Sequence, residues 1–169
     1  MTRAQRWNHV NFAVPPQRLP LVEECIDMLF GWEKFVAKPY LLGYRLTGDM
    51  HEAALYFRPA PAAAAVLDAL DRLRGRDAGL DTALGALDGL EGDWVDHIGF
   101  MTASLQEWEE RLALARRLER ERPDLTIRVV DVLSPGDGRA QTDDLHQAFI
   151  RIGLLGPLRN TFEMQARKP

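Results

Sequence analysis

The chain has 169 residues, of which 46% are hydrophobic and 27% charged, a composition typical of a compact globular protein. Its formal net charge of -4 argues against a general affinity for nucleic acid or anionic membranes, because both need a basic surface. No apolar run approaches the roughly 20 residues that span a bilayer, and the first residues lack the apolar segment of a secretory signal. We therefore expect a cytoplasmic protein, a monomer or homodimer, with a small molecule as its partner.

The first part of the chain predicts the order βαβββ. Residues 7–14 alternate between apolar and polar side chains, as in a half-buried strand. Residues 20–31 place Leu21, Cys25, Met28 and Leu29 on one side of a helix that Gly31 closes. Three strands are expected at 33–38, 41–46 and 52–58. Cys25, the single cysteine, is expected to be a buried and inert thiol.

The second part repeats this order. An alternating strand is expected at 95–102, followed by a helix that starts with a capping box of Ser104 and Glu107 and ends before Pro123. Further strands are expected at 126–133, 146–152 and 160–165, with an exposed loop at 134–145. The segments NHVNF and DHIGF share a histidine, a branched aliphatic residue and a phenylalanine, which indicates an internal duplication.

The predicted fold class is therefore α+β, with two tandem βαβββ modules that form a curved mixed sheet around a central cavity. Residues 1–59 form the first module and residues 95–169 the second. Residues 60–94 are too long for a plain connection. Their composition favours a helical linker or insertion, with a lid over the cavity as the alternative.

Three side chains are candidate metal ligands. In the strands at 7–14 and 95–102 the apolar residues cover the core, so His9 and His97 point to the opposite side. The same alternation turns Glu163 away from the core face of the last strand. Two imidazoles and one carboxylate with open positions suit Fe²⁺ best, and also accept Mn²⁺, Ni²⁺, Co²⁺ or Zn²⁺. Asn11, Thr161 and Gln165 share these faces and are candidate substrate-binding residues.

The two half-motifs NHVNFAV and DHIGFMT, the helix end LFGWEKF and the terminal NTFEMQ together resemble the vicinal oxygen chelate superfamily. This superfamily includes glyoxalase I, extradiol ring-cleaving dioxygenases and bleomycin-resistance proteins. The resemblance implies metal ligands on the first strand of each module and on the last strand of one or both. His9, His97 and Glu163 match these positions. The fourth position falls on Tyr56, where glyoxalase I has a carboxylate or amide.

The run from 144 to 163 is similar to the extradiol dioxygenase signature. His146, Pro157 and Glu163 match it, while Gly153 stands where that family has a tyrosine. The resemblance implies His146 as a candidate acid or base, with Tyr56 or Tyr44 as candidates to replace the missing phenol. Trp7 is a candidate wall of an aromatic ligand pocket, with packing at the module junction as the alternative.

The functional expectation is a metal-dependent, dioxygenase-like enzyme whose substrate chelates a divalent metal through vicinal oxygens. One alternative is a non-enzymatic protein that binds a small molecule such as an antibiotic. The other is an isomerase or lyase of the glyoxalase type. A purely structural module is disfavoured by the polar residues on the predicted cavity faces.

Overall fold

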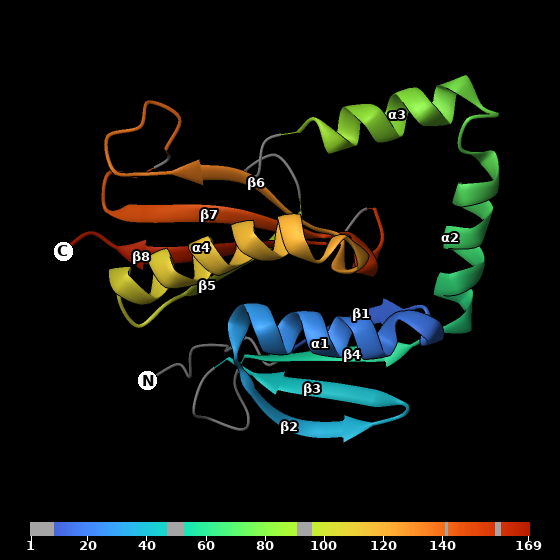
Figure 1. Cartoon of the computed structure of the whole chain (residues 1–169), viewed down its shortest axis with the longest axis horizontal. Coiled ribbons are helices and arrows are strands. Elements are labelled where there is room, and N and C mark those ends of the chain that lie inside the picture. Colours follow the sequence, from blue (N-terminus) through green and yellow to red (C-terminus); the bar gives the residue numbers. More distant parts are fainter. Residues whose placement is uncertain (1–8, 47–52, 91–95, 141, 158–159) are drawn as a thin grey trace, which may run out of the picture. The chain divides into compact units, whose positions relative to one another are not determined.

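The computed structural model describes residues 9–46, 53–90, 96–140, 142–157 and 160–169. It divides into two compact units, residues 1–69 and 70–169, and each unit has its own four-stranded mixed sheet. Each sheet is crossed by one long helix (Figure 1). No helix in the described part of the chain is long and apolar enough to cross a membrane.

Module one, residues 9–59, has the predicted order βαβββ. Its elements are β1 (His9–Val14), a short 3₁₀ turn η1 (Pro16–Arg18), α1 (Leu19–Phe30), β2 (Glu33–Lys38), β3 (Leu41–Arg45) and β4 (Ala54–Pro59). The strand order is β1-β4-β3-β2, with β1 and β4 parallel. Gly31, with φ 57°, ends α1 in the left-handed region that glycine adopts without strain.

The buried stripe of α1 is rotated from the predicted one. Cys25 and Leu29 are buried as expected, but Met28 is 38% exposed and Leu21 is half-buried. Val22, Ile26 and Phe30 lie in the core instead. The helix is apolar on more than one side, so sequence spacing alone did not fix which side meets the sheet.

Module two, residues 97–167, repeats the order. Its elements are β5 (His97–Met101), α4 (Leu105–Glu121), η3 (Pro123–Leu125), β6 (Ile127–Leu133), β7 (Leu145–Ile152), η4 (Gly153–Leu155) and β8 (Thr161–Arg167). The strand order is β5-β8-β7-β6. The capping box is present: the Ser104 hydroxyl accepts from the Glu107 N–H, and the Glu107 carboxylate accepts from the Ala103 N–H. The fold class and the duplication are confirmed.

The segment between the modules forms two helices, α2 (Pro61–Leu73) and α3 (Ala78–Asp88), and neither contains a buried residue. Asp77 caps α3 by accepting from the N–H groups of Gly79 and Leu80. The helical character of this segment agrees with its composition. Its role as linker or lid stays a prediction.

Equivalent strands pair in the same register in the two modules. His9 lies opposite Ala54 and Asn11 opposite Tyr56 in the β1–β4 pair. His97 lies opposite Thr161 and Gly99 opposite Glu163 in the β5–β8 pair. Tyr56 is therefore the register equivalent of Glu163, as predicted from the sequence. In each sheet we call the side that carries these residues the site face, and the side covered by α1 or α4 the helix face.

Candidate metal centre

Glu163 is the centre of the site face of module two. It lies on β8 between β5 and β7, and its side chain is 7% exposed. Glu163 Oε2 is 3.3 Å from His97 Nε2. Glu163 Oε1 accepts hydrogen bonds of 2.6 Å from both Gln147 Nε2 and Gln165 Nε2. One carboxylate oxygen is thus held by two amides, while the other points to the imidazole.

The spacing of His97 and Glu163 suits two ligands of one metal ion. Two atoms each about 2.1 Å from a metal are about 3.0 Å apart at a right angle and about 3.4 Å apart at a tetrahedral angle. The observed 3.3 Å lies in this range. The His97 side chain is 27% exposed, so the imidazole can be reached from solvent.

Gly99 leaves room beside the carboxylate. A Cβ at this position would stand 3.0 Å from Glu163 Oε2, which is closer than a Cβ normally approaches another atom. Because Oε1 is already tied to two amides, the carboxylate has little freedom to move away. The glycine therefore keeps Oε2 approachable from the β5 side.

His97 is also held by an aromatic ring. Its imidazole packs edge-on against Phe149, with ring centroids 5.4 Å apart and planes at 85°. Phe149 lies directly opposite Glu163 in the β7–β8 pair. The ring thus limits the imidazole to the side of the carboxylate.

In module one the equivalent face carries His9 and Tyr56. Their rings meet edge-on with centroids 5.4 Å apart, and Tyr56 is edge-on to Phe35 at 5.7 Å. The Asn11 amide oxygen accepts a hydrogen bond of 3.1 Å from Arg58 Nε. Gly43, opposite Tyr56, makes room for these rings, because a Cβ there would lie 2.9 Å from the Phe35 ring. An aromatic cluster fills the place of the buried carboxylate.

The structure separates the other predicted site residues into two groups. Thr161 and Gln165 share the site face with Glu163, as expected from alternation. Thr161 is 3% exposed and its hydroxyl donates to Asn160 Oδ1 at 3.3 Å. His146 and Tyr44 lie on the helix faces instead. Trp7 lies outside the described residues.

His146 is not brought to Glu163. Its neighbours Gln147 and Phe149 point to the site face, and alternation places His146 on the other side of β7. There its imidazole packs on Trp108 of α4 with ring centroids 5.4 Å apart. The resemblance to the dioxygenase signature implies a site position for His146, but the phase of β7 places its side chain on the helix face.

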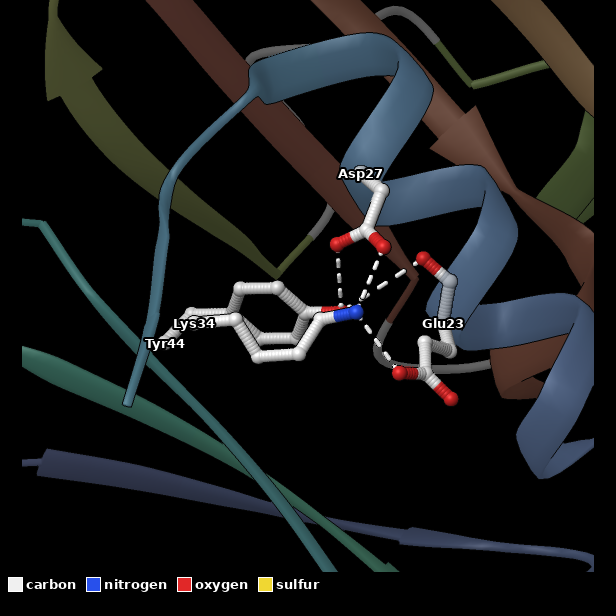
Figure 2. Close-up of polar contacts among 4 residues, drawn as sticks. All are labelled: Glu23, Asp27, Lys34 and Tyr44. Atoms are coloured by element: carbon white, nitrogen blue, oxygen red, sulfur yellow. Dashed lines mark hydrogen bonds and ion pairs between the residues drawn. The ribbon is translucent and has the colours of Figure 1, made fainter. Parts of the chain in front are cut away.

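Tyr44 is fully buried under α1. Figure 2 shows its hydroxyl pointing to Asp27, 2.9 Å from Oδ1, beside Lys34, whose Nζ lies 2.6 Å from both Glu23 and Asp27. Burial and the Asp27 hydrogen bond raise the pKa of Tyr44 far above its ordinary value. Tyr44 therefore joins the helix to the sheet as a neutral phenol and does not share a face with Tyr56.

Gly153 has no room for the tyrosine of the dioxygenase signature. A Cβ there would meet the Thr126 hydroxyl oxygen at 2.9 Å. Sequence reasoning missed Gln147 and Phe149, which hold Glu163 and His97. The signal that could have found them is the alternation of side chains along β7. Counted from Phe149 rather than from His146, it places Gln147 and Phe149 on the site face.

Within the part of the chain that the structure describes, no group of three or more His, Cys, Asp or Glu side chains gathers as metal ligands. His97 and Glu163 lie together in module two, and His9 lies in module one. The complete ligand trio stays a prediction.

No family model matches the chain, and no curated protein sequence is significantly similar to it. Its structure is similar to that of a lactoylglutathione lyase from Agrobacterium tumefaciens, with a TM-score of 0.52, 14% identity and coverage of 98% of this chain and 96% of the other. A glyoxalase-related enzyme from Fulvimarina pelagi matches with a TM-score of 0.50, 10% identity and coverage of 96% and 88%. A glyoxalase/bleomycin resistance protein/dioxygenase from Nocardioides matches with a TM-score of 0.50, 9% identity and coverage of 99% and 86%. At these identities the similarity shows the fold.

Proposed function

We propose that this chain, which has the fold of the vicinal oxygen chelate proteins, is a metal-dependent enzyme that acts on a small molecule with two adjacent oxygens. The proposal is supported above all by the buried Glu163 carboxylate, with one oxygen fixed by two amides and the other 3.3 Å from His97 Nε2. Such outer partners orient a ligand carboxylate and are a common feature of metal sites.

In this proposal His97 and Glu163 hold the metal, and His9 is the third ligand. The place of His9 in the trio is supported by the duplicated NHV and DHI strands and by their equal register. When bound, the metal supplies Lewis acidity and a template for the two substrate oxygens. Phe149 limits the rotation of His97, and Gly99 keeps the approach to Glu163 Oε2 free.

A dioxygenase-like reaction with Fe²⁺ is favoured over glyoxalase isomerisation. The register equivalent of Glu163 in module one is Tyr56, a phenol in contact with His9, whereas glyoxalase I has a carboxylate or amide ligand there. Three protein ligands leave more open positions for substrate and oxygen. Tyr56 is the proposed proton-transfer residue, since it shares a face with His9.

Metal binding tests this proposal directly. The full chain is stripped with a chelator and titrated with Mn²⁺ or, without oxygen, Fe²⁺ by calorimetry. We expect one metal ion per chain and an affinity at least about 100-fold lower in Glu163→Gln and His97→Ala, since losing a ligand costs more than losing an outer partner. His146→Gln is the matched control and retains the affinity, because His146 lies on the helix face.

Equal metal affinity in the wild type and Glu163→Gln would sink the proposal. His9→Ala tests the third ligand separately and is expected to lower the affinity as His97→Ala does. Assays of the metal-loaded protein with catechols and with thiol hemiacetals then separate ring cleavage from isomerisation. We expect the metal-loaded wild type to turn over catechols. We expect Tyr56→Phe to lose this turnover while its metal affinity stays unchanged.

A second candidate function is non-enzymatic binding of a small molecule on the same faces. It is favoured by two observations: His146 packs on Trp108, and Gly153 leaves no room for the dioxygenase tyrosine. Ligand binding that persists in the presence of chelator, without product, supports this candidate. Turnover that requires metal excludes it.

A further inference from the structure

Module two places two arginines side by side on its site face. Arg151 of β7 lies directly opposite Arg128 of β6 in the antiparallel pair. Residues opposite each other share a face, and like charges in this position repel. Arg128 is exposed, whereas the Arg151 side chain is only 8% exposed. The sheet therefore holds two neighbouring guanidinium groups, one of them buried.

The charge of Arg151 is only weakly compensated within the described residues. Arg151 Nη1 lies 3.3 Å from the Asp88 carbonyl oxygen and 3.4 Å from Asp88 Oδ1, both at the long end of hydrogen-bonding distance. The Asp88 side chain is 66% exposed. Arg151 Nη2 is buried and has no hydrogen-bond partner in the described part of the chain. A buried N–H without an acceptor costs free energy, so a bound acceptor at this nitrogen would be stabilising.

Electrostatics agree with this geometry. Burial lowers the pKa of Arg151, Asp88 acts in the opposite direction, and Arg128 lowers it further. A guanidinium nevertheless stays charged at neutral pH. The pair thus keeps its positive charge in a place where the described residues supply little negative charge.

Module one provides a natural comparison. At the equivalent register, Arg45 of β3 lies opposite Glu33 of β2, and the two side chains form an ion pair of 3.1 Å. The Arg45 guanidinium also lies over the Phe35 ring at 4.9 Å. The same place in the fold therefore holds an arginine with a carboxylate in module one and an arginine with an arginine in module two.

The arginine pair lies in the same row of residues as His97. Thr161 stands opposite His97 on one side and opposite Arg151 on the other. Neighbouring strands are about 4.8 Å apart, so the Cα atoms of His97 and Arg151 are separated by about 10 Å. This is the span of a small molecule with a polar group at each end.

We propose that Arg151 and Arg128 bind an anionic group, a carboxylate or a phosphate, of the small molecule that acts at His97 and Glu163. Two guanidinium groups offer forked donors that match the oxygens of such an anion. Asp88 contacts Arg151 when no anion is present, and it competes with an anion for this arginine. The assignment of the anion to the substrate rests on the proposed function, whereas the anion site itself rests on the arginines.

Titration of inorganic phosphate and of malonate into the full chain, first stripped of metal and then dialysed free of chelator, tests the site without any metal. At least one of the two anions is expected to bind. Arg128→Glu reproduces the Arg–Glu pair of module one and is expected to lower the affinity at least tenfold. Arg151→Gln has the same effect, and Asp88→Asn raises the affinity several-fold because a competing carboxylate is removed. Arg116→Gln, an exposed charge on α4, leaves it unchanged.

The inference is overturned if neither anion binds, if Arg128→Glu binds as the wild type does, or if Arg116→Gln loses as much affinity as Arg128→Glu. It is also overturned if Asp88→Asn weakens binding, since Arg151 would then only anchor α3. Arg128 is exposed, so the decisive variant does not depend on a change in the core. Because no metal is present, failure of the metal centre leaves this result intact.

Discussion

The two modules share one scaffold but fill it with different chemistry. Their first strands pair with their last strands in the same register, so each site-face position of one module has an equivalent in the other. Module two has the buried carboxylate of Glu163, fixed by two glutamine amides, where module one has the ring of Tyr56. Module two has two neighbouring arginines where module one has an ion pair.

This difference teaches where specialisation occurs in a duplicated fold. The helix faces keep the apolar packing that each module needs to fold, whereas the site faces are free to diverge. Module one fills its site face with aromatic contacts and the Glu33–Arg45 ion pair, although the buried Arg45 Nε has no hydrogen-bond partner among the described residues. Module two directs Glu163 Oε2 to His97 and leaves the buried Arg151 Nη2 without a hydrogen-bond partner among the described residues. We infer that module two carries most of the binding chemistry.

The largest expected stability difference concerns how each helix is fastened to its sheet. Trp108 Nε1 of α4 donates to the buried Met164 carbonyl oxygen at 2.9 Å. Trp108→Phe leaves this carbonyl without its partner and is expected to cost about 1–3 kcal/mol in the free energy of unfolding. Tyr44→Phe is the module-one control and should cost about 1 kcal/mol, because Asp27 keeps Lys34 as a partner. Chemical denaturation measures both, and a larger loss in Tyr44→Phe would contradict the comparison.

A glycine substitution tests whether the site faces differ in function. Gly99→Ala pushes a methyl group against Glu163 Oε2, whose carboxylate is tied to two amides, so metal affinity should fall about tenfold. Asn11→Ala changes the equivalent position of β1 and should leave metal affinity within about twofold. Calorimetric titration of both variants checks this. Equal effects would show that the two faces contribute alike.

The smallest expected effect is a difference in pH dependence. Burial lowers the pKa of Lys34, but its hydrogen bonds to Asp27 and Glu23 outweigh this and raise it, and the pKa of Tyr44 is raised by burial. Both pKa values lie higher in the folded state than in the unfolded state. Their stabilisation is therefore complete below about pH 10 and decreases as the pH rises above that value.

The stability of module two is expected to depend on pH in the opposite direction. The Ala103 N–H and Arg111 lower the pKa of Glu107, so its contribution is present above its ordinary pKa of 4.5 and is lost as the pH falls. Chemical denaturation at increasing pH should show an alkaline loss of less than about 1 kcal/mol in the free energy of unfolding, which we assign to module one. Tyr44→Phe should reduce that alkaline loss. An unchanged alkaline profile in this variant would refute the assignment to Tyr44.

Much of the fold could be predicted from local pattern. Alternation located the strands to within about two residues, the Ser104–Glu107 capping box marked the start of α4, and Gly31 marked the end of α1. The repeated NHV and DHI segments predicted the duplication, and the family resemblance together with alternation in residues 52–58 predicted the equivalence of Tyr56 and Glu163. These features depend on neighbours in the chain, which a sequence displays directly.

The tertiary structure decided which face of the sheet each side chain occupies and which residues it contacts. His146 and Tyr44 carry suitable chemistry, but the phase of β7 and β3 turns them under α4 and α1. Gln147, Phe149 and the Arg128–Arg151 pair became visible only when strand pairing set them beside Glu163 and beside each other. The sequence alone determined which side chains are present and in what order. Which of them meet depends on register between strands that are distant in the chain, because one residue of shift moves every side chain to the other face.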